Sequence, residues 1–252
     1  NQQILGRGME SFILALRDKK LVLWQGHIYD ILLAVDTDND GVKETLWGQP
    51  FHARDFFLSG AVRQYMPVNG ALQPQQEVLV PYMFRATGAA LAKLSTNGQR
   101  TLVFVDSQNM LRVFHNKEDL WKSPEKVGGS YTYGEIEQTI SRDVMKFPFF
   151  FEAIPLAQDL DGDGIDEVLV VSNASSFSFV PNLQQYSGGS IALLREENYG
   201  YSLSPISPQF NGIISGIIAV PGTPPALLIA VTKPKGFFGQ GGTTTLFLSR
   251  LQ

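Results

Sequence analysis

Short apolar runs separated by polar turns follow one another along the whole chain. Runs such as residues 102–105 and 168–171 consist of leucine, valine and phenylalanine, which is typical of short strands buried on both faces. Glycine or proline interrupts almost every window long enough for a helix. The pattern predicts an all-β chain, in which only residues 134–144 are expected to form a short helix. A hairpin is expected around the polar turn at residues 18–20.

The chain also repeats a strand, an acidic loop and a second strand. Residues 36–44 (DTDNDGVKE) align without a gap with residues 159–167 (DLDGDGIDE). A degraded copy of the loop occupies residues 93–101, and a more eroded repeat covers residues 213–231. The repeats recur at intervals of about sixty residues, as in repeat architectures. Glycine turns before a further strand recur at residues 59–60, 187–189 and 241–242.

Each repeat has room for four strands, and four-stranded sheets repeated radially are the pattern of a β-propeller. We therefore expect residues 1–252 to form a single β-propeller domain, or a fragment of one, with about four and a half blades. Residues 1–27 would end a preceding blade, and the successive blades would span residues 28–80, 81–148, 149–210 and 211–252. A β-solenoid is the second interpretation and a tandem sandwich the third.

The two intact loops have the composition of calcium sites. Calcium takes several oxygen ligands, and carboxylates at alternate positions of a tight loop can converge on one ion. Glycine at the sixth position permits the sharp turn, and the seventh residue would offer its backbone carbonyl. The sequence therefore predicts two calcium sites, with these ligands: Asp36, Asp38, Asp40, Val42 and Glu44 in the first, and Asp159, Asp161, Asp163, Ile165 and Glu167 in the second.

An EF-hand is excluded because it needs a glutamate at the twelfth position, where this chain has Trp47 and Val170. The degraded loop has Lys93 at its first position. We expect it to keep the loop shape without metal, with the Lys93 ammonium or the Asn97 side chain making the hydrogen bonds that replace calcium.

Catalytic patterns are missing from the sequence. It has no cysteine, and its histidines, His27, His52 and His115, fall in different repeats. The glycine-rich residues 236–242 lack the lysine and hydroxyl residue of a phosphate-binding loop. The prediction is therefore a protein that is not an enzyme.

Other features narrow the possible partners. A net charge of −4 argues against nucleic acid, and the apolar runs are too short to cross a membrane. The aromatic residues 147–151 are expected in a core rather than in an exposed binding patch. Residues 173–175 form a glycosylation sequence, which matters only in a eukaryotic secretory pathway. Because the chain starts with asparagine rather than methionine, we interpret it as a processed or excised piece.

The acidic loops between strands, repeated at about sixty residues, resemble the FG-GAP (VCBS) repeats of integrin-α-like β-propellers. Residues 120–124 and 128–130 also look like bacterial envelope proteins of this type. The resemblance implies calcium in loops on one face of a ring, ligand recognition by other loops, and an extracytoplasmic location (periplasm, outer surface or secreted). It also implies a seven-bladed ring, which missing blades or a second chain would have to complete.

These expectations combine into one predicted function. The chain would be a non-catalytic, calcium-binding β-propeller that serves as a binding module for protein or carbohydrate at the cell envelope or outside the cell. The alternative is an ancillary propeller of a larger secreted enzyme that degrades polysaccharide. A catalytic domain upstream would distinguish the two.

Overall fold

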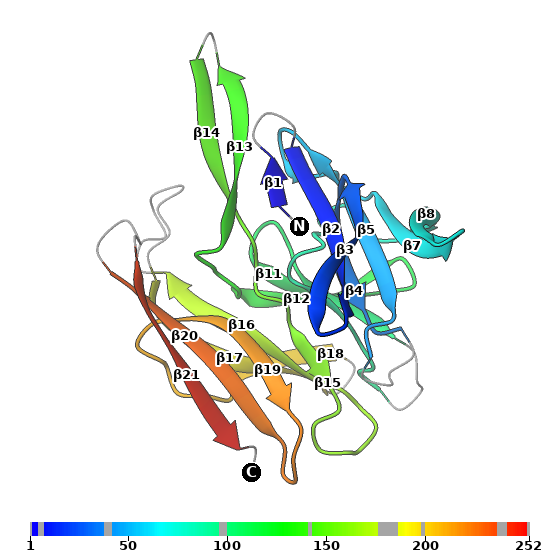
Figure 1. Ribbon diagram of the computed structural model, residues 1–252. Coiled ribbons are helices and arrows are strands. Elements are labelled where there is room, and N and C mark those ends of the chain that lie inside the picture. The colour runs from blue at the N-terminus through cyan, green and yellow to red at the C-terminus, as the bar shows by residue number, and fades with distance from the viewer. Residues whose placement is uncertain are drawn as a thin grey trace. The chain divides into compact units, whose positions relative to one another are not determined.

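The computed structural model describes residues 2–4, 8–37, 42–95, 100–140, 143–175, 186–197, 200–235 and 241–250 (Figure 1). Every regular element in these ranges is a β-strand, and all the paired strands run antiparallel to their neighbours. The all-β prediction is therefore confirmed. The chain divides into two compact units, one of Asn1–Ala86 with Gly134–Phe149 and one of Thr87–Tyr133 with Phe150–Gln252.

The first unit begins with a three-stranded sheet of β1 (Gln2–Ile4), β2 (Gly8–Arg17) and β3 (Lys20–Ile28). Arg17 pairs with Lys20 across a two-residue turn. Asp18 and Lys19 in that turn both have positive φ, 49° and 63°, as the tight turns that match the twist of a hairpin require. The hairpin predicted around residues 18–20 is confirmed.

The second sheet of this unit is a meander in the order β4-β5-β7-β8. In β4, Ile31, Leu33 and Val35 are buried, so its apolar positions follow the two-residue period of a strand. The bounds are β4 (Asp30–Val35), β5 (Thr45–His52), β7 (Val62–Val68) and β8 (Ala71–Val78), with the short β6 (Phe56–Phe57) paired to β5.

The helix predicted at residues 134–144 is wrong. This segment forms most of a hairpin of β13 (Tyr133–Ile140) and β14 (Asp143–Phe150). The Lys146 ammonium in β14 lies 3.0 Å from Glu135 and 3.9 Å from Glu137. Residues two apart share a face in a strand but not in a helix, and the segment follows that two-residue period.

In the aromatic run at residues 147–151, the ring of Phe149 packs against other aromatic rings of the first unit. This ring stacks on the fully buried Phe56 at 4.7 Å and meets Phe57 edge-on at 5.4 Å. The Arg85 guanidinium lies 4.5 Å from the centre of the Phe149 ring. These contacts support the core interpretation over the binding-patch interpretation for this residue.

The second unit contains three sheets, each an antiparallel meander. One is β12-β11-β10-β9, with β9 (Ala89–Ala92), β10 (Thr101–Val105), β11 (Met110–His115) and β12 (Glu118–Lys126). The next is β15 (Leu156–Gln158), β16 (Glu167–Ser175), β17 (Tyr186–Glu197) and β18 (Gly200–Pro205). The last is β19 (Ile213–Val220), β20 (Ala226–Pro234) and β21 (Gly242–Arg250).

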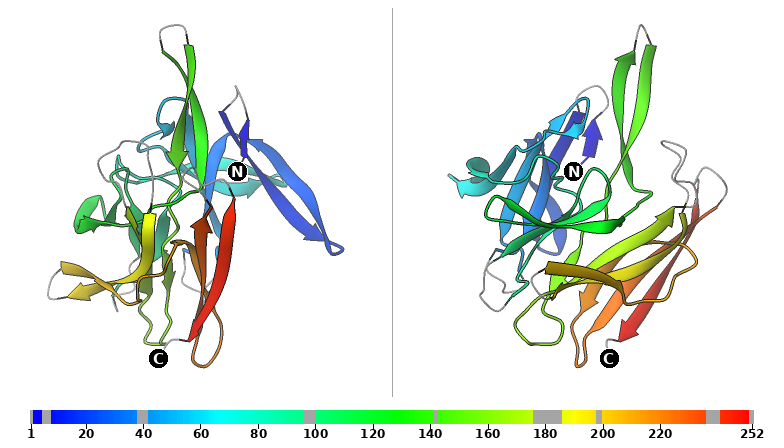
Figure 2. Two further views of the ribbon diagram at one scale, coloured as in Figure 1. Left: turned by 90° about the vertical axis from the view of Figure 1, so that its left-hand side faces the viewer. Right: turned by 180° about the vertical axis from the view of Figure 1, so that it is seen from behind.

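The middle sheet of this unit is buried on both faces. Val168 and Val170 of β16 belong to the core shared with β9–β12, whereas Leu169 and Val171 belong to the core shared with β19–β21. Figure 2 shows the strands of these sheets from two further sides. The continuous apolar run at residues 168–171 is thus a strand between two cores, as its pattern predicts.

The four predicted strand–loop–strand segments are all present as antiparallel pairs: β4 with β5, β9 with β10, β15 with β16, and β19 with β20. Each pair opens a meander. The described part of the chain contains no closed ring or barrel of sheets. The propeller and its blade boundaries therefore stay predictions.

Candidate metal centre

The intact loop of the second unit joins β15 to β16. Gly162 and Gly164 both have φ of +84°, a region that residues with a Cβ rarely adopt. This geometry lets the Asp159 carboxylate accept hydrogen bonds from the N–H of Gly162 at 2.7 Å and of Gly164 at 2.9 Å. Asp159 therefore stabilises the turn by accepting hydrogen bonds from two of its backbone N–H groups.

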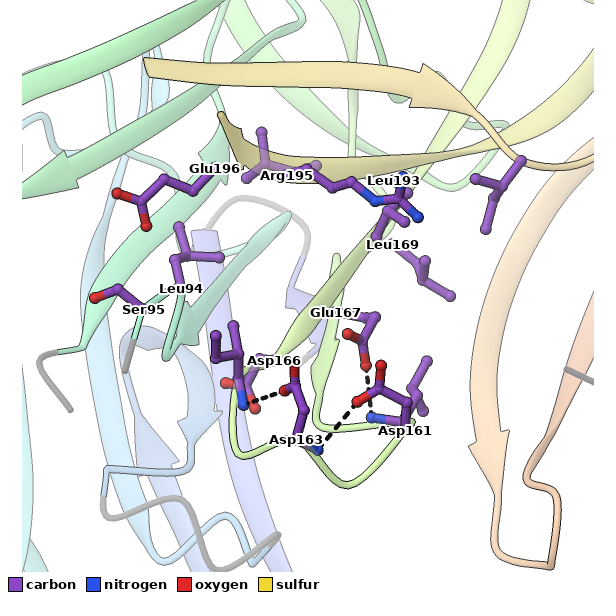
Figure 3. Close-up of a pocket in the computed structure, with 14 residues that line it drawn as sticks. Leu94, Ser95, Asp161, Asp163, Asp166, Glu167, Leu169, Leu193, Arg195 and Glu196 are labelled. Atoms are coloured by element: carbon purple, nitrogen blue, oxygen red, sulfur yellow. Dashed lines mark hydrogen bonds between the residues drawn. The ribbon is translucent and has the colours of Figure 1, made fainter. Parts of the chain in front are cut away.

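The other carboxylates of the loop are also held by backbone N–H groups. Asp161 accepts a hydrogen bond from the N–H of Asp163 at 3.1 Å, and Asp163 accepts one from Ile165 at 2.7 Å. Glu167 accepts one from the N–H of Leu160 at 2.7 Å. Figure 3 shows the Asp161 and Glu167 side chains on the same side of the loop. Each carboxylate of the loop therefore has a backbone N–H partner.

Three of the predicted ligands converge. One carboxylate oxygen from each of Asp159, Asp161 and Glu167 lies within 4.8 Å of the other two. Two oxygens on opposite sides of a calcium ion are separated by about 5 Å, twice the usual calcium–oxygen distance, so the three residues fit calcium. Asp163 is not part of this group, and its ligation and that of the Ile165 carbonyl stay predictions.

The crowding of carboxylates has an electrostatic consequence at Glu167. Burial raises the pKa of its carboxyl, and the negative charges of Asp161, Asp163 and Asp159 raise it further, against the lowering effect of the Leu160 N–H. The ionised form of Glu167 is thus less favourable in the empty loop than it is for a free glutamate. A cation between the carboxylates would reverse this effect.

The loop of the first unit is described only in part. Asp38 and Asp40 lie outside the described residues, whereas Asp36, Val42 and Glu44 are described. The Glu44 carboxylate accepts hydrogen bonds from the hydroxyl and, at 2.8 Å, the N–H of Thr37. Hydrogen bonds to this carboxylate, first from the Thr37 hydroxyl, then from the backbone of Glu44 itself and from the N–H of Thr37, lower its pKa to about 2.

The two loops share this contact. In both, the glutamate at position nine accepts a hydrogen bond from the N–H of position two, which is Thr37 in one loop and Leu160 in the other. The two loops therefore share this hydrogen bond as well as their sequence pattern.

The backbone at the start of the degraded loop forms hydrogen bonds with the intact loop. The N–H of Lys93 donates to the Asp166 carboxylate at 2.7 Å, and the N–H of Asp166 donates to the Lys93 carbonyl at 2.8 Å. A Cβ on Gly164 would lie 3.9 Å from the Lys93 ammonium nitrogen, so this cation stands beside the intact loop. Asn97 and its neighbours 96–99 lie outside the described residues, and the shape of the degraded loop stays a prediction.

An open pocket of about 810 Å³ adjoins the acidic loop. Its acidic side includes Asp161, Asp163 and Glu167, and its apolar side includes Leu169 and Leu193 (Figure 3). Arg195 and Glu196 of β17 also line it. A calcium ion in the loop would therefore lie at the wall of a depression large enough for a ligand.

The three histidines have separate local partners. The Nδ1 atoms of His27 and His52 lie 2.8 Å from Glu10 and 3.1 Å from Asp55, respectively. His115 Nδ1 lies 2.8 Å from the carbonyl oxygen of Arg100. These contacts agree with the structural role expected for isolated histidines, and the absence of catalysis stays a prediction.

Asn173 is an inter-sheet residue that its sequence pattern did not reveal. Its Nδ2 donates to the carbonyls of Gly129 at 2.7 Å and Ile214 at 3.0 Å, and its Oδ1 accepts the Ile214 N–H at 2.9 Å. Both amide donors are engaged, so the glycosylation reading of this residue does not fit the fold. A polar side chain inside the apolar strand β16 was the available signal.

No family model matches the chain, and no curated protein matches it. The resemblance to FG-GAP repeats therefore stays a prediction from the loops. The described residues contain no helix that is long and apolar enough to span a membrane.

Proposed function

We propose that this chain is a non-catalytic, calcium-binding β-propeller module that binds a protein or carbohydrate partner outside the cytoplasm. The convergence of Asp159, Asp161 and Glu167 within 4.8 Å carries the proposal. Carboxylate oxygens are the ligands that calcium prefers. Burial raises the pKa of Glu167, and the charges of Asp161, Asp163 and Asp159 raise it further, so a cation at this point would relieve repulsion between the carboxylates.

The propeller part of the proposal is supported by the repeated meander. Four sheets begin with the same strand–loop–strand pair. In the second unit, the middle sheet packs both faces against neighbouring sheets, as a blade does. Missing blades or a second chain would supply the rest of a ring.

The binding role is supported by the pocket beside the loop. Its wall combines acidic residues with leucine side chains, a composition that suits a ligand with both polar and apolar groups. The extracytoplasmic setting belongs to the proposal because calcium modules outside the cell fill at millimolar calcium.

Calcium titration of the purified chain tests the proposal directly. Calorimetry should show binding, and at about 100 times the dissociation constant the ion should stabilise the fold by about 2.7 kcal/mol. EDTA should lower the melting temperature correspondingly. Glu167→Gln should remove the part of the calcium response that comes from this loop, because it removes a charge from the converging group, and it should leave any binding by the loop of the first unit.

A matched control is Glu77→Gln, which changes an exposed glutamate of β8 in the other compact unit. It should bind calcium like the wild type. The calcium proposal fails if the wild-type chain melts at the same temperature in EDTA and in several millimolar calcium, on the scale of extracellular modules. It also fails if Glu167→Gln keeps the full calcium response.

A further inference from the structure

A positively charged side chain from the degraded loop lies beside the acidic loop of the second unit. Lys93 follows β9 and occupies the first position of the degraded loop, where the intact loops have aspartate. Lys93 is half-buried, and its ammonium nitrogen Nζ would lie 3.9 Å from a Cβ placed on Gly164. The charge of Lys93 therefore belongs to the surroundings of the candidate metal centre.

Two hydrogen bonds hold the backbone of Lys93 at this place. Its N–H donates to the Asp166 carboxylate at 2.7 Å, and its carbonyl accepts the Asp166 N–H at 2.8 Å. The next two residues, Leu94 and Ser95, line the pocket that adjoins the acidic loop (Figure 3). Because the backbone of Lys93 makes these bonds, they do not depend on its side chain, which can be exchanged without breaking them.

The Lys93 ammonium is close to the carboxylates of the loop without forming an ion pair. The Gly164 N–H donates to an Asp159 oxygen at 2.9 Å, and a Cβ stands about 2.5 Å from the nitrogen of its own residue. The Lys93 Nζ is therefore no more than about 9 Å from that Asp159 oxygen. Among the described residues, no carboxylate forms an ion pair with it.

The acidic loop has more negative charge than one calcium ion compensates. Four of its predicted ligands are acidic: Asp159, Asp161, Asp163 and Glu167. A divalent ion compensates two of these charges. A lysine nearby is attracted to the carboxylates of the empty loop, and this attraction weakens once the ion is bound. The same lysine therefore stabilises the empty loop more than the calcium-bound loop.

We propose that Lys93 is a tethered counter-charge of this loop, which partly neutralises the empty carboxylates and lowers the affinity of the loop for calcium. The inference rests on the proposed calcium site and adds a residue that regulates it. Since the ammonium forms no ion pair in the described residues, calcium need not break one to bind. The two cations oppose each other through their charges.

The test compares Lys93→Met, which removes the charge and keeps an aliphatic side chain, with Lys93→Arg, which keeps the charge. Every variant also carries Asp36→Asn, which removes a predicted ligand of the other loop, so that calcium titration reports the loop of the second unit. The chain with Asp36→Asn alone is the parent. Lys93→Gln provides the same loss of charge should Lys93→Met not fold by circular dichroism.

At about 10 mM salt, Lys93→Met should bind calcium roughly twofold to twentyfold more tightly than the parent. An ion bound to Asp159 would lie within about 12 Å of the ammonium, and the range covers effective dielectric constants from about 80 to 20. Lys93→Arg should stay within about twofold of the parent, on the same scale. The gain in Lys93→Met should shrink at about 1 M salt, where the screening length is about 3 Å.

Thermal melts in EDTA measure the effect on the empty loop without calcium. Lys93→Met should melt about 2–4 °C below the parent, because the empty carboxylates lose their counter-charge, and saturating calcium should narrow this gap. The matched control is Lys122→Met, at an exposed lysine of β12. In its sheet, β12 lies three strands from β9, about 14 Å away. This variant should change calcium affinity by less than about twofold.

The proposal is overturned if the parent binds calcium and Lys93→Met binds it equally or more weakly at low salt. It is also overturned if Lys93→Arg gains as much affinity as Lys93→Met. If the parent binds no calcium, the calcium proposal fails for this loop, and the melts in EDTA then decide the role of Lys93. A lower melting temperature that Lys93→Arg restores supports the counter-charge, whereas an unchanged or unrestored one contradicts it.

Discussion

Replacing Asn173 by alanine should destabilise the second unit strongly. The side chain makes three hydrogen bonds, to the carbonyl of Gly129 and to both backbone groups of Ile214. Ile214 is fully buried, so its N–H and C=O would lose a partner that water does not readily replace. At a net value of about 1 kcal/mol for each bond, we expect a loss of about 3 kcal/mol.

Urea unfolding followed by tryptophan fluorescence and circular dichroism measures this loss. Asn173→Asp is informative because it still accepts the Ile214 N–H but cannot donate to either carbonyl. It should be at least as destabilising as alanine. The control is Ser187→Ala, whose exposed hydroxyl makes one long hydrogen bond of 3.4 Å to Ala174. A change below about 0.5 kcal/mol for Asn173→Ala, the range of ordinary surface substitutions, would refute the inter-sheet role.

Two glycine substitutions complete the predictions. Gly48→Ala should cost about 2 kcal/mol or more in urea unfolding, because its Cβ would lie 2.4 Å from the Tyr65 ring and 2.9 Å from the Asp30 side chain. Gly162→Ala meets no atom within 4 Å but requires φ of +84°. It should cost about 1 kcal/mol and weaken calcium binding in a titration, because the turn that aims Asp159 would be strained.

The strand pairs were predictable because their signal is local. Apolar runs on both sides of a polar loop predict two strands in contact, and β15 with β16 follows this pattern. The two-residue turn after Arg17 is equally local. The helix predicted at residues 134–144 is wrong because a segment with little glycine and no proline can form a strand as well as a helix. Glu135 and Glu137 lie on one face of β13, next to Lys146.

The metal loop was predictable in composition but not in detail. Asp159, Asp161 and Glu167 converge, whereas Asp163 turns one oxygen to the Ile165 N–H. The spacing of the carboxylates is fixed by sequence, but their directions depend on which backbone N–H each one meets. Local spacing therefore predicts the candidates for ligation and not their final number.

The long-range hydrogen bonds of two amide side chains lay beyond sequence reasoning. Gln49 in β5 donates to the carbonyls of Leu58 and Phe84 and accepts the N–H of Ala86. Asn173 makes the same kind of contact in the other compact unit. Each is an amide side chain in a strand with many apolar residues. Its hydrogen bonds reach backbone groups far along the chain, 35 residues away for Gln49 with Phe84 and 44 residues away for Asn173 with Gly129. No periodicity within a strand contains that information.

The strand β16 links the metal loop to the packing of the second unit. It starts at Glu167, a ligand candidate, and carries Asn173 near its other end. Between them, Val168 to Val171 alternate between two cores. Beside the ligands, Asp166 exchanges two hydrogen bonds with the backbone of Lys93 in the neighbouring sheet's loop. An ion that fixes the loop would therefore fix the contact between two sheets as well, and calcium bound there would have a structural role even where a partner binds elsewhere.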